Sequence, residues 1–527
     1  MSRVKALIAG LLVAIAFCAT TVFHLDAQGA FYDELHQAPA AFHYVGKHPV
    51  LFTRMFFGRP TFNMTYSGAI KSAMYGLFLK YLHPHFTVYS WRLFGILFVA
   101  AGLVAFYCIA GPSLPTATLV CFAALLLTDI TVIILTRHDW APVALALALR
   151  LVFLATWLSI ELQRDALYKY GVAGFIVGVA VFEKLSSVVL LVPLLILLFR
   201  SRWRSAWMVA AAGLLVGVLP LLQANTHTYR TTRTFISLSD VVGVQHSIDF
   251  NELSLYGFRY LSLGAGELAR HNLMGELTGS FFVIADAALT VVLLVIIGGA
   301  RLLLPKNRLM RLAAVMGASY ALIGLGLFFL PHPTYFHHWI VGSPFQYCAI
   351  ALALPVLNTM SSKKIPRAAA YRLIFLVSLV GLVAIRLPNV AGMERSLVSG
   401  KASLGFSPAF SRLADLASAK KETSFFIAAD WGTANQIYCG ADGDDEIVGE
   451  PLGSADPIRA ALDMAAATKK PILYVVRSGL PQPATETSVA ILDAIRNSGD
   501  WLEVRPDEIL LNFEPVQIHE FRRGSVR

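Results

Sequence analysis

Residues 170–199, YGVAGFIVGVAVFEKLSSVVLLVPLLILLF, decide how often the chain crosses a membrane. The stretch is too long for one helix across about 30 Å of hydrocarbon. Glu183 and Lys184 also interrupt it near the middle. We therefore predict two short spans joined by a tight turn.

The composition of the whole chain is that of a multi-span membrane protein. Of its 527 residues, 56% are apolar and 14% are charged, and the mean hydropathy is +0.63. This is far from the balance of a soluble domain. Besides the hairpin, apolar runs predict spans at 6–24, 90–110, 115–135, 140–160, 206–224, 280–300, 312–331, 339–357 and 368–388.

The distribution of lysine and arginine supports the hairpin, because cytoplasmic loops carry an excess of these residues. Eleven spans put every basic cluster on the cytoplasmic side: Arg3 with Lys5, 200–204, 301–311 and 363–372. A single helix over 170–199 would put the last three clusters outside. The N-terminus is then cytoplasmic, and we prefer an uncleaved first span to a signal peptide. The net charge of +10 mostly reflects these clusters and favours anionic lipids over nucleic acid as partners.

Charged residues and turn formers return from Val390 onward. The strand-like runs SFFIAA and PILYVV alternate there with the helix-like runs DPIRAALDMAAATKK and ETSVAILDAIRNSG. This alternation predicts a small α/β domain. We therefore predict a transmembrane domain over 1–389, with a first outer loop at 25–89, and an α/β domain over 390–527 on the periplasmic side.

The first outer loop begins with GAFYDELHQAPAAFHYV at 29–45. Its apolar residues recur every three to four positions, which predicts an amphipathic helix along the membrane surface. Pro39 would kink or shorten that helix. The rest of the loop is rich in histidine, tyrosine and phenylalanine, which suit either an interfacial belt or stacking on sugar faces.

Asp33 and Glu34 lie off the apolar stripe of this helix. Consecutive residues are about 100° apart on a helix, so the two carboxylates point in different directions and we expect different roles for them. One could approach a reacting hydroxyl while the other orients a cation such as Arg54, Arg59 or a lipid-facing residue. The alternative is that both solvate the helix start, where acids also favour the helix dipole.

FYDELHQ, directly after the first span, resembles the acidic first-loop motif of the GT-C glycosyltransferases. Three later stretches are similar to family segments in the same order: TRHDWAPVALALALR, VGVAVFEKLSSVVLLVP and TYFHHWIVGSPFQYCAIAL. The resemblance covers about residues 1–360. It is strongest to the protein O-mannosyltransferases and lipid A aminoarabinose transferases, and to family-39-like bacterial members. Many relatives have a His-Pro-Pro-Leu type segment where this chain has MTYSG at 64–68, which leaves the donor sugar and the acceptor open.

The resemblance implies a GT-C fold and a transferase that uses a polyprenyl-phosphate sugar. It also implies that an acidic first-loop residue is the catalytic base. By position this role falls to Asp33, with Glu34 as its neighbour. The second acidic position of the family falls to Asp139, which would help to hold the acceptor or the donor.

The chemistry itself calls for such residues. A sugar hydroxyl needs a carboxylate to accept its proton as it attacks an anomeric carbon, and a departing phosphate needs fixed cations in a poorly hydrated site. The candidates at the outer ends of the spans are Arg92, Arg137, His138, Lys184, His337 and His338. Their alternative role is snorkelling or orientation. No cofactor follows from the sequence, although His138 and Asp139 could contribute to a divalent cation site.

We therefore expect an inverting glycosyltransferase of the bacterial inner membrane that transfers a sugar to a lipid, glycan or protein at the outer face. The main alternative is a lipid-linked sugar translocase, which should carry polar residues mid-span and paired halves. The acids here gather at outer ends instead, except for Asp129 and Asp286. A sensor would not need eleven spans, and an acyltransferase or polymer ligase would need an essential outer histidine.

Overall fold

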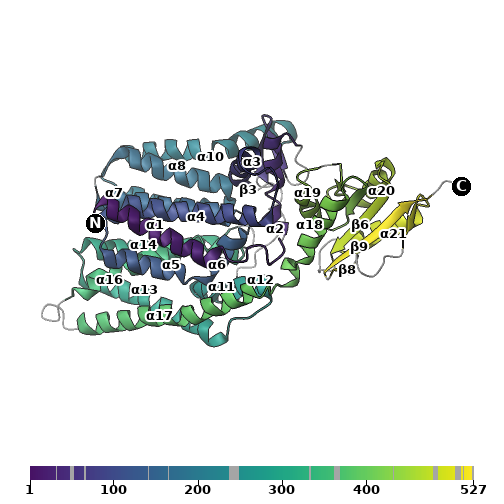
Figure 1. The fold of residues 1–527 in the computed structure, drawn as a ribbon. Coiled ribbons are helices and arrows are strands. Elements are labelled where there is room, and N and C mark those ends of the chain that lie inside the picture. The colour runs from purple at the N-terminus through teal and green to yellow at the C-terminus, as the bar shows by residue number, and fades with distance from the viewer. Residues whose placement is uncertain are drawn as a thin grey trace. The chain divides into compact units, whose positions relative to one another are not determined.

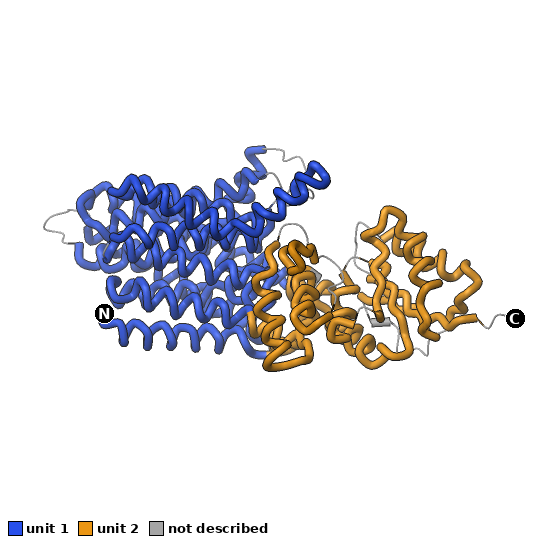
Figure 2. The backbone as a smooth tube through the Cα atoms, turned by 90° about the horizontal axis from the view of Figure 1, so that it is seen from above, with its two compact units in different colours: residues 1–23, 95–271, 276–396 blue, residues 24–94, 272–275, 397–527 orange. Residues whose placement is uncertain are grey.

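The computed structural model describes residues 1–30, 32–47, 53–63, 67–140, 142–163, 165–236, 249–330, 334–360, 368–430, 432–444, 446–478, 485–504, 512–513 and 515–524. Residue 31, residues 64–66 and residues 363–367, which carry some of the predictions above, lie outside these ranges. The chain forms two compact units, shown in different colours in Figure 2. Unit 1 comprises residues 1–23, 95–271 and 276–396, and unit 2 comprises residues 24–94, 272–275 and 397–527.

The long helices form at the positions that hydropathy predicts (Figure 1). Among the described residues, seven helices are long and apolar enough to cross a membrane: α1 (Arg3–Thr21), α4 (Val88–Ala110), α7 (Val143–Leu162), α10 (Ser205–Thr232), α13 (Ser280–Leu303), α14 (Arg308–Phe328) and α17 (Ala368–Val398). The pair α5 (Thr116–Leu127) and α6 (Ile130–His138), bent by 64°, would be an eighth span. The remaining predicted spans form shorter helices, namely α8 (Leu167–Glu183), the 3-10 helix η3 (Leu185–Leu190) with α9 (Leu191–Phe199), and α16 (Ser343–Asn358). The predicted class, a polytopic helical membrane protein, is confirmed.

The hairpin predicted for residues 170–199 is confirmed as well. The backbone of Lys184 is extended, at φ −148° and ψ 109°, and ends α8. Near the start of α8, Lys169 Nζ donates to the Ser159 hydroxyl at 2.7 Å. Just after α9, Arg200 Nε pairs with a Glu161 carboxylate oxygen at 2.8 Å. Both partners lie near the end of α7, so α9 returns the chain to the side from which α8 departs.

Helices α8 and α10 lie side by side (Figure 1) and meet through two GxxxG motifs, Gly174 with Gly178 and Gly213 with Gly217. A Cβ added at Gly174 would lie 2.0 Å from the Ala210 carbonyl oxygen. Small residues of this spacing let two membrane helices approach until their backbones touch. The absence of side chains at these positions therefore sets the distance between α8 and α10.

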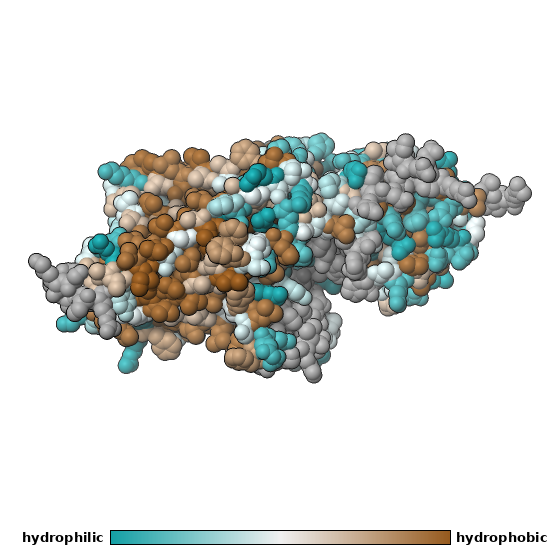
Figure 3. All heavy atoms as spheres, turned by 90° about the horizontal axis from the view of Figure 1, so that it is seen from below, coloured by the Kyte–Doolittle hydropathy of each residue, from teal (hydrophilic) through white to brown (hydrophobic). Residues whose placement is uncertain are grey.

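A buried polar network ties together four membrane segments of unit 1. Arg386 of α17 forms two hydrogen bonds with Asp286 of α13, at 2.6 and 3.1 Å. Tyr347 of α16 donates its hydroxyl to the carboxylate of Asp129, which itself caps the start of α6 by accepting from Val132 N at 2.9 Å. The two mid-span acids noted in the sequence are thus compensated by neighbours. Exposed apolar side chains gather over the helices of unit 1 (Figure 3), as a surface in contact with lipid requires.

The C-terminal part of unit 2 is a layered α/β domain, as the sequence predicts. Its sheet has the strand order β5-β4-β6-β9-β7. Strands β4 (Ser424–Ala428), β5 (Val448–Gly449) and β6 (Ile472–Ser478) are parallel, and β9 (Val516–Arg523) runs antiparallel to β6, β7 (Trp501–Glu503) and β8 (Asn512–Phe513). Two separate apolar cores lie against it, one with α18 (Ala409–Lys420) and α19 (Thr433–Gly440), the other with α20 (Pro457–Ala467) and α21 (Thr485–Asn497).

The segment predicted as the first outer loop, residues 25–89, belongs to the same unit and keeps that name below. The helix expected along its apolar stripe is split into a single turn, α2 (Tyr32–Leu35), and a 3-10 helix that starts at Pro39 (Pro39–Val45). Leu35, Ala38 and Phe42 are buried in one core with α18 and α19. The Phe42 and Tyr438 rings meet edge to face at 5.4 Å. A short antiparallel sheet, β1 (Thr53–Phe56), β2 (Arg59–Asn63) and β3 (Ser67–Gly68), leads into helix α3 (Ile70–Tyr81).

We predict that Gly174→Ala lowers the melting temperature of the purified protein, because the new methyl group would separate α8 from α10. Gly298→Ala in α13 is the matched control, since nothing lies within 4 Å of its added Cβ. Alanine favours a helix over glycine by up to about 1 kcal/mol, so the control should melt at the same or a higher temperature. Equal melting temperatures for both variants would contradict the packing described here.

Candidate functional site

The buried ion pair between Glu34 and Arg92 organises the acidic segment of the first outer loop. Arg92 Nε lies 2.6 Å from one Glu34 oxygen, and a terminal nitrogen lies 2.8 Å from the other. The guanidinium also donates to the carbonyl oxygens of Leu25, Gln28 and Gly29. Both side chains of the pair are at most 1% exposed. A planar guanidinium fits a carboxylate in this two-pronged way, so Arg92 serves as the centre around which residues 25–34 fold.

Two further side chains complete this cluster. Trp91 Nε1 donates to the backbone carbonyl oxygen of Glu34 at 3.2 Å. Lys71 Nζ, on α3, lies 3.6 Å from the centroid of the Trp91 ring, and Lys71 is buried. An ammonium over an indole face is attracted by the ring quadrupole. Lys71 was not predicted as a site residue, although a lysine inside the apolar run GAIKSAMYG is itself a signal.

Asp33 differs from its neighbour in its environment. It lies in the first turn of α2 and is only half-buried, whereas Glu34 is 1% exposed. The two adjacent acids therefore differ in burial. The cation that Glu34 holds is Arg92 rather than Arg54 or Arg59, which are exposed on β1 and β2.

A second cluster of predicted site residues lies within unit 1, at the end of α6. Arg137 is buried and donates to the Thr21 carbonyl oxygen at 3.0 Å. His138 is the last residue of α6 and is also buried. Asp139 has a left-handed backbone, φ 39°, and accepts a hydrogen bond from Ala144 N at 2.8 Å. Asp139 thus joins the end of α6 to the first turn of α7, which is a structural function in addition to any contact with substrate.

Lys184, His337 and His338 come together in the same unit. The rings of His337 and His338 are 4.1 Å apart, and Trp140 stacks on His337 at 6.0 Å. Burial lowers the pKa of His337 well below its ordinary value, and the nearby His338 and Lys184 lower it further. His337 is therefore neutral at physiological pH and can either donate or accept a hydrogen bond. Trp140, which follows directly after the predicted pair His138 and Asp139, was not singled out from the sequence.

Arg150 is another residue that sequence reasoning missed. It lies on α7, is fully buried, and none of its three nitrogen atoms has a hydrogen-bond partner among the described residues. A lone arginine inside the apolar run VALALALRLVF is costly in a membrane. That position alone would have marked Arg150 as a candidate.

A metal site can be tested against the donor set. Within the described ranges, no group of three or more histidine, cysteine, aspartate or glutamate side chains could hold an ion. His138 and Asp139 are close in sequence, but Asp139 uses one carboxylate oxygen to cap α7. Within the described ranges, His138 and Asp139 therefore have no third histidine, cysteine, aspartate or glutamate placed to share a metal ion with them.

No protein-family model matches the chain, and neither does any curated protein. Among solved structures, the chain is similar over 98% of both lengths to ArnT, the lipid A aminoarabinose transferase of Cupriavidus metallidurans, solved with bound undecaprenyl phosphate (TM-score 0.60, 13% identity). The fold is the GT-C fold.

A second solved structure supports this fold assignment. The archaeal oligosaccharyltransferase AglB of Archaeoglobus fulgidus, in complex with an inhibitory peptide and a dolichol-phosphate, matches 96% of this chain and 73% of its own (TM-score 0.51, 12% identity). The resemblance stated from the sequence motifs is thereby confirmed at the level of the fold.

We predict that Glu34→Gln lowers the free energy of unfolding by about 3–5 kcal/mol, because it leaves Arg92 buried without a counter-charge. Asp33→Asn, one residue away, should change it by less than about 1 kcal/mol, since that side chain is half-buried. Equilibrium unfolding in mixed micelles measures both. Similar losses for the two variants would contradict the separate environments of these acids.

Proposed function

We propose that this protein is an inverting glycosyltransferase that moves a sugar from a polyprenyl-phosphate donor to a hydroxyl of a lipid, glycan or protein acceptor. The observation that carries the proposal is the contrast between two adjacent acids. Both oxygens of Glu34 are held by Arg92, while Asp33 is half-buried. The fold shared with ArnT and AglB, whose solved structures contain undecaprenyl phosphate and a dolichol-phosphate, supports a lipid-phosphate donor.

Asp33 would act as the catalytic base. Its carboxylate would accept the proton of the acceptor hydroxyl while the hydroxyl oxygen forms a bond to the anomeric carbon from the face opposite the phosphate. The bond between that carbon and the phosphate oxygen breaks at the same time, and its electrons leave with the polyprenyl phosphate. Attack from the opposite face inverts the anomeric configuration. Glu34 is a positioning residue here, because both of its carboxylate oxygens are held by Arg92.

The phosphate of the donor requires cations. The contacts of each candidate residue show whether it is better suited to bind phosphate or to position other residues. Arg92 donates its hydrogen bonds to Glu34 and to three backbone carbonyl oxygens. We therefore assign it a positioning role rather than phosphate binding. Lys184 provides an ammonium group, and His337 and His338 provide imidazoles beside it. Within unit 1, these three residues are the proposed binding cluster for an anionic phosphate group. Arg137, His138 and Asp139 would hold the adjoining backbone in place.

We also propose the orientation that the basic loops indicate. The N-terminus would be cytoplasmic and the α/β domain periplasmic, in a bacterial inner membrane. The reaction would then take place at the outer face, where no nucleotide sugar is available and a lipid-linked donor is required. Exposed arginines Arg54 and Arg59 on β1 and β2 would contact lipid headgroups or acceptor there.

We predict that Asp33→Asn reduces transfer of label from radiolabelled polyprenyl-phosphate sugars to membrane acceptors by a factor of about 10²–10⁴. Asp415→Asn, an exposed acid on α18, is the control and should transfer as the wild type does. The melting temperature of each variant shows that folding is retained.

Unchanged transfer by Asp33→Asn would remove this residue as the base. No transfer from any donor of the panel by the wild-type protein would favour the translocase, which can be measured as movement of the same lipid-linked sugars across vesicle membranes. The compensated network around Arg386 and Asp286 is the mid-span polar feature such a translocase would use.

A further inference from the structure

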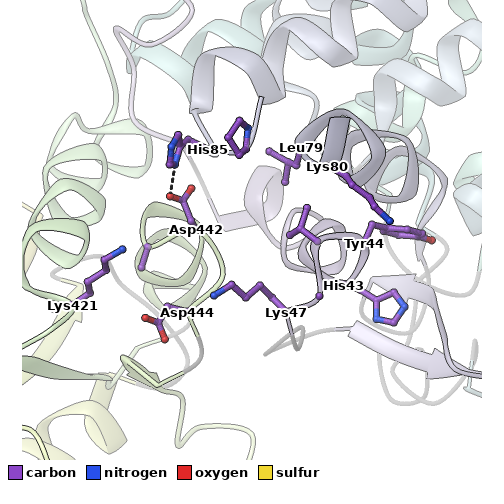
Figure 4. Close-up of a pocket in the computed structure, with 13 residues that line it drawn as sticks. His43, Tyr44, Lys47, Leu79, Lys80, His85, Lys421, Asp442 and Asp444 are labelled. Carbon is purple, nitrogen blue, oxygen red and sulfur yellow. Dashed lines mark hydrogen bonds and ion pairs between the residues drawn. The ribbon is translucent and has the colours of Figure 1, made fainter. Parts of the chain in front are cut away.

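Unit 2 contains a groove that the proposed transfer chemistry does not use. It has a volume of about 710 Å³. It is lined by residues 43–47 of the first outer loop, by residues around the end of α3, and by Lys421, Ala441, Asp442 and Asp444 of the α/β domain (Figure 4). We call it the lysine groove, after Lys47, Lys80 and Lys421, which all line it. Ligand-binding clefts commonly have volumes of roughly 300–1,000 Å³.

The acids of the groove are occupied by local hydrogen bonds. Asp442 accepts from His85 Nδ1 and from Phe86 N, both at 2.8 Å, and these contacts join the end of α3 to the α/β domain. Asp444 accepts from Glu446 N at 3.0 Å. Figure 4 shows the His85 contact with Asp442 at the edge of the groove. The two carboxylates therefore shape the groove.

The three lysines of the groove differ from these two aspartates in their contacts. No ion pair involves Lys47, Lys80 or Lys421 among the described residues. The Lys80 ammonium lies 5.5 Å from the centroid of the Tyr81 ring. The lining therefore carries three ammonium groups against two carboxylates, and those carboxylates already accept hydrogen bonds from His85 and from backbone N–H groups. The net positive charge favours an anionic ligand.

The walls suit a sugar chain. Tyr44 and His43 offer aromatic faces, and Leu79 and Pro84 add apolar surface. Aromatic rings present an apolar body on which a sugar ring can stack while its hydroxyls bond to neighbouring polar groups. A neutral glycan would not require three lysines, and a purely inorganic anion would not require the aromatic walls.

We propose that the lysine groove binds an anionic glycan, a sugar chain that carries phosphate or carboxylate groups, and that this glycan is the acceptor. Its role as acceptor rests on the proposed transferase function. Binding of the glycan to the groove does not rest on that function, because the groove and the cluster around Glu34 and Arg92 share no residue. Lysines act as point charges toward either anion, so phosphate and carboxylate are two sources of one recognition chemistry.

The test measures binding to the purified full-length protein in detergent, without donor, by isothermal titration calorimetry. The probes are an oligogalacturonate, a phosphorylated oligosaccharide of the same length, and a neutral oligosaccharide of that length. The variant is Lys47→Gln, Lys80→Gln and Lys421→Gln combined, and the control is Lys469→Gln, an exposed lysine of the α/β domain that does not line the groove. Melting temperatures confirm that both are folded.

We expect at least one anionic probe to bind the wild type, and the triple variant to bind it about tenfold or more weakly, while Lys469→Gln binds as the wild type does. Added salt should weaken binding to the wild type more than to the triple variant. The stronger anionic probe identifies phosphate or carboxylate as the recognised group. Equal affinities of the wild type and the triple variant, or a neutral probe that binds as well as both anionic ones, would overturn the proposal.

The two proposals fail separately. Lysine-dependent glycan binding together with an absence of transfer from every donor would leave the groove in place and remove the transferase. Transfer that depends on Asp33 but is unaffected by the triple lysine variant would retain the transferase and overturn the groove as its acceptor site.

Discussion

Glu34 and Arg92 place opposite charges side by side where both are almost fully buried. Removing either charge from such a pair leaves the other buried without a counter-charge, which typically lowers the free energy of unfolding by about 3–5 kcal/mol. Because the same guanidinium also binds the carbonyl oxygens of residues 25, 28 and 29, the chain must wrap around Arg92 as it enters the first outer loop. The half-buried position of Asp33 is a consequence of this wrapping, and the proposed chemistry depends on it.

The membrane segments could be predicted because each depends on local composition. Apolar runs define the helices, and the basic loops required a hairpin at 170–199, which the contacts of Lys169 and Arg200 confirm. The α/β alternation after Val390 was equally local. The conformation of the first outer loop was harder to predict from the sequence, because Leu35, Ala38 and Phe42 are buried in a core formed with residues near the other end of the chain.

Partners distant in sequence were beyond prediction. The pairing of Glu34 with Arg92 joins positions 58 residues apart, and nothing in the local sequence selects Arg92 over Arg54 or Arg59 as the partner of Glu34. The lysine groove likewise arises only when separate segments meet. Some missed features did leave a signal. The GxxxG motifs of α8 and α10, and the lone charges of Lys71 and Arg150 within apolar runs, can all be read from the sequence.

The most direct test is a double-mutant cycle for the Glu34 and Arg92 pair, using Glu34→Gln, Arg92→Met and both together. The quantity measured is the free energy of unfolding in mixed micelles. If the pair organises the first outer loop, the double variant should lose less unfolding free energy than the two single variants lose together. The difference, which is the coupling energy, should be at least about 2 kcal/mol. Additive losses, with a coupling energy below about 0.5 kcal/mol, would contradict the account.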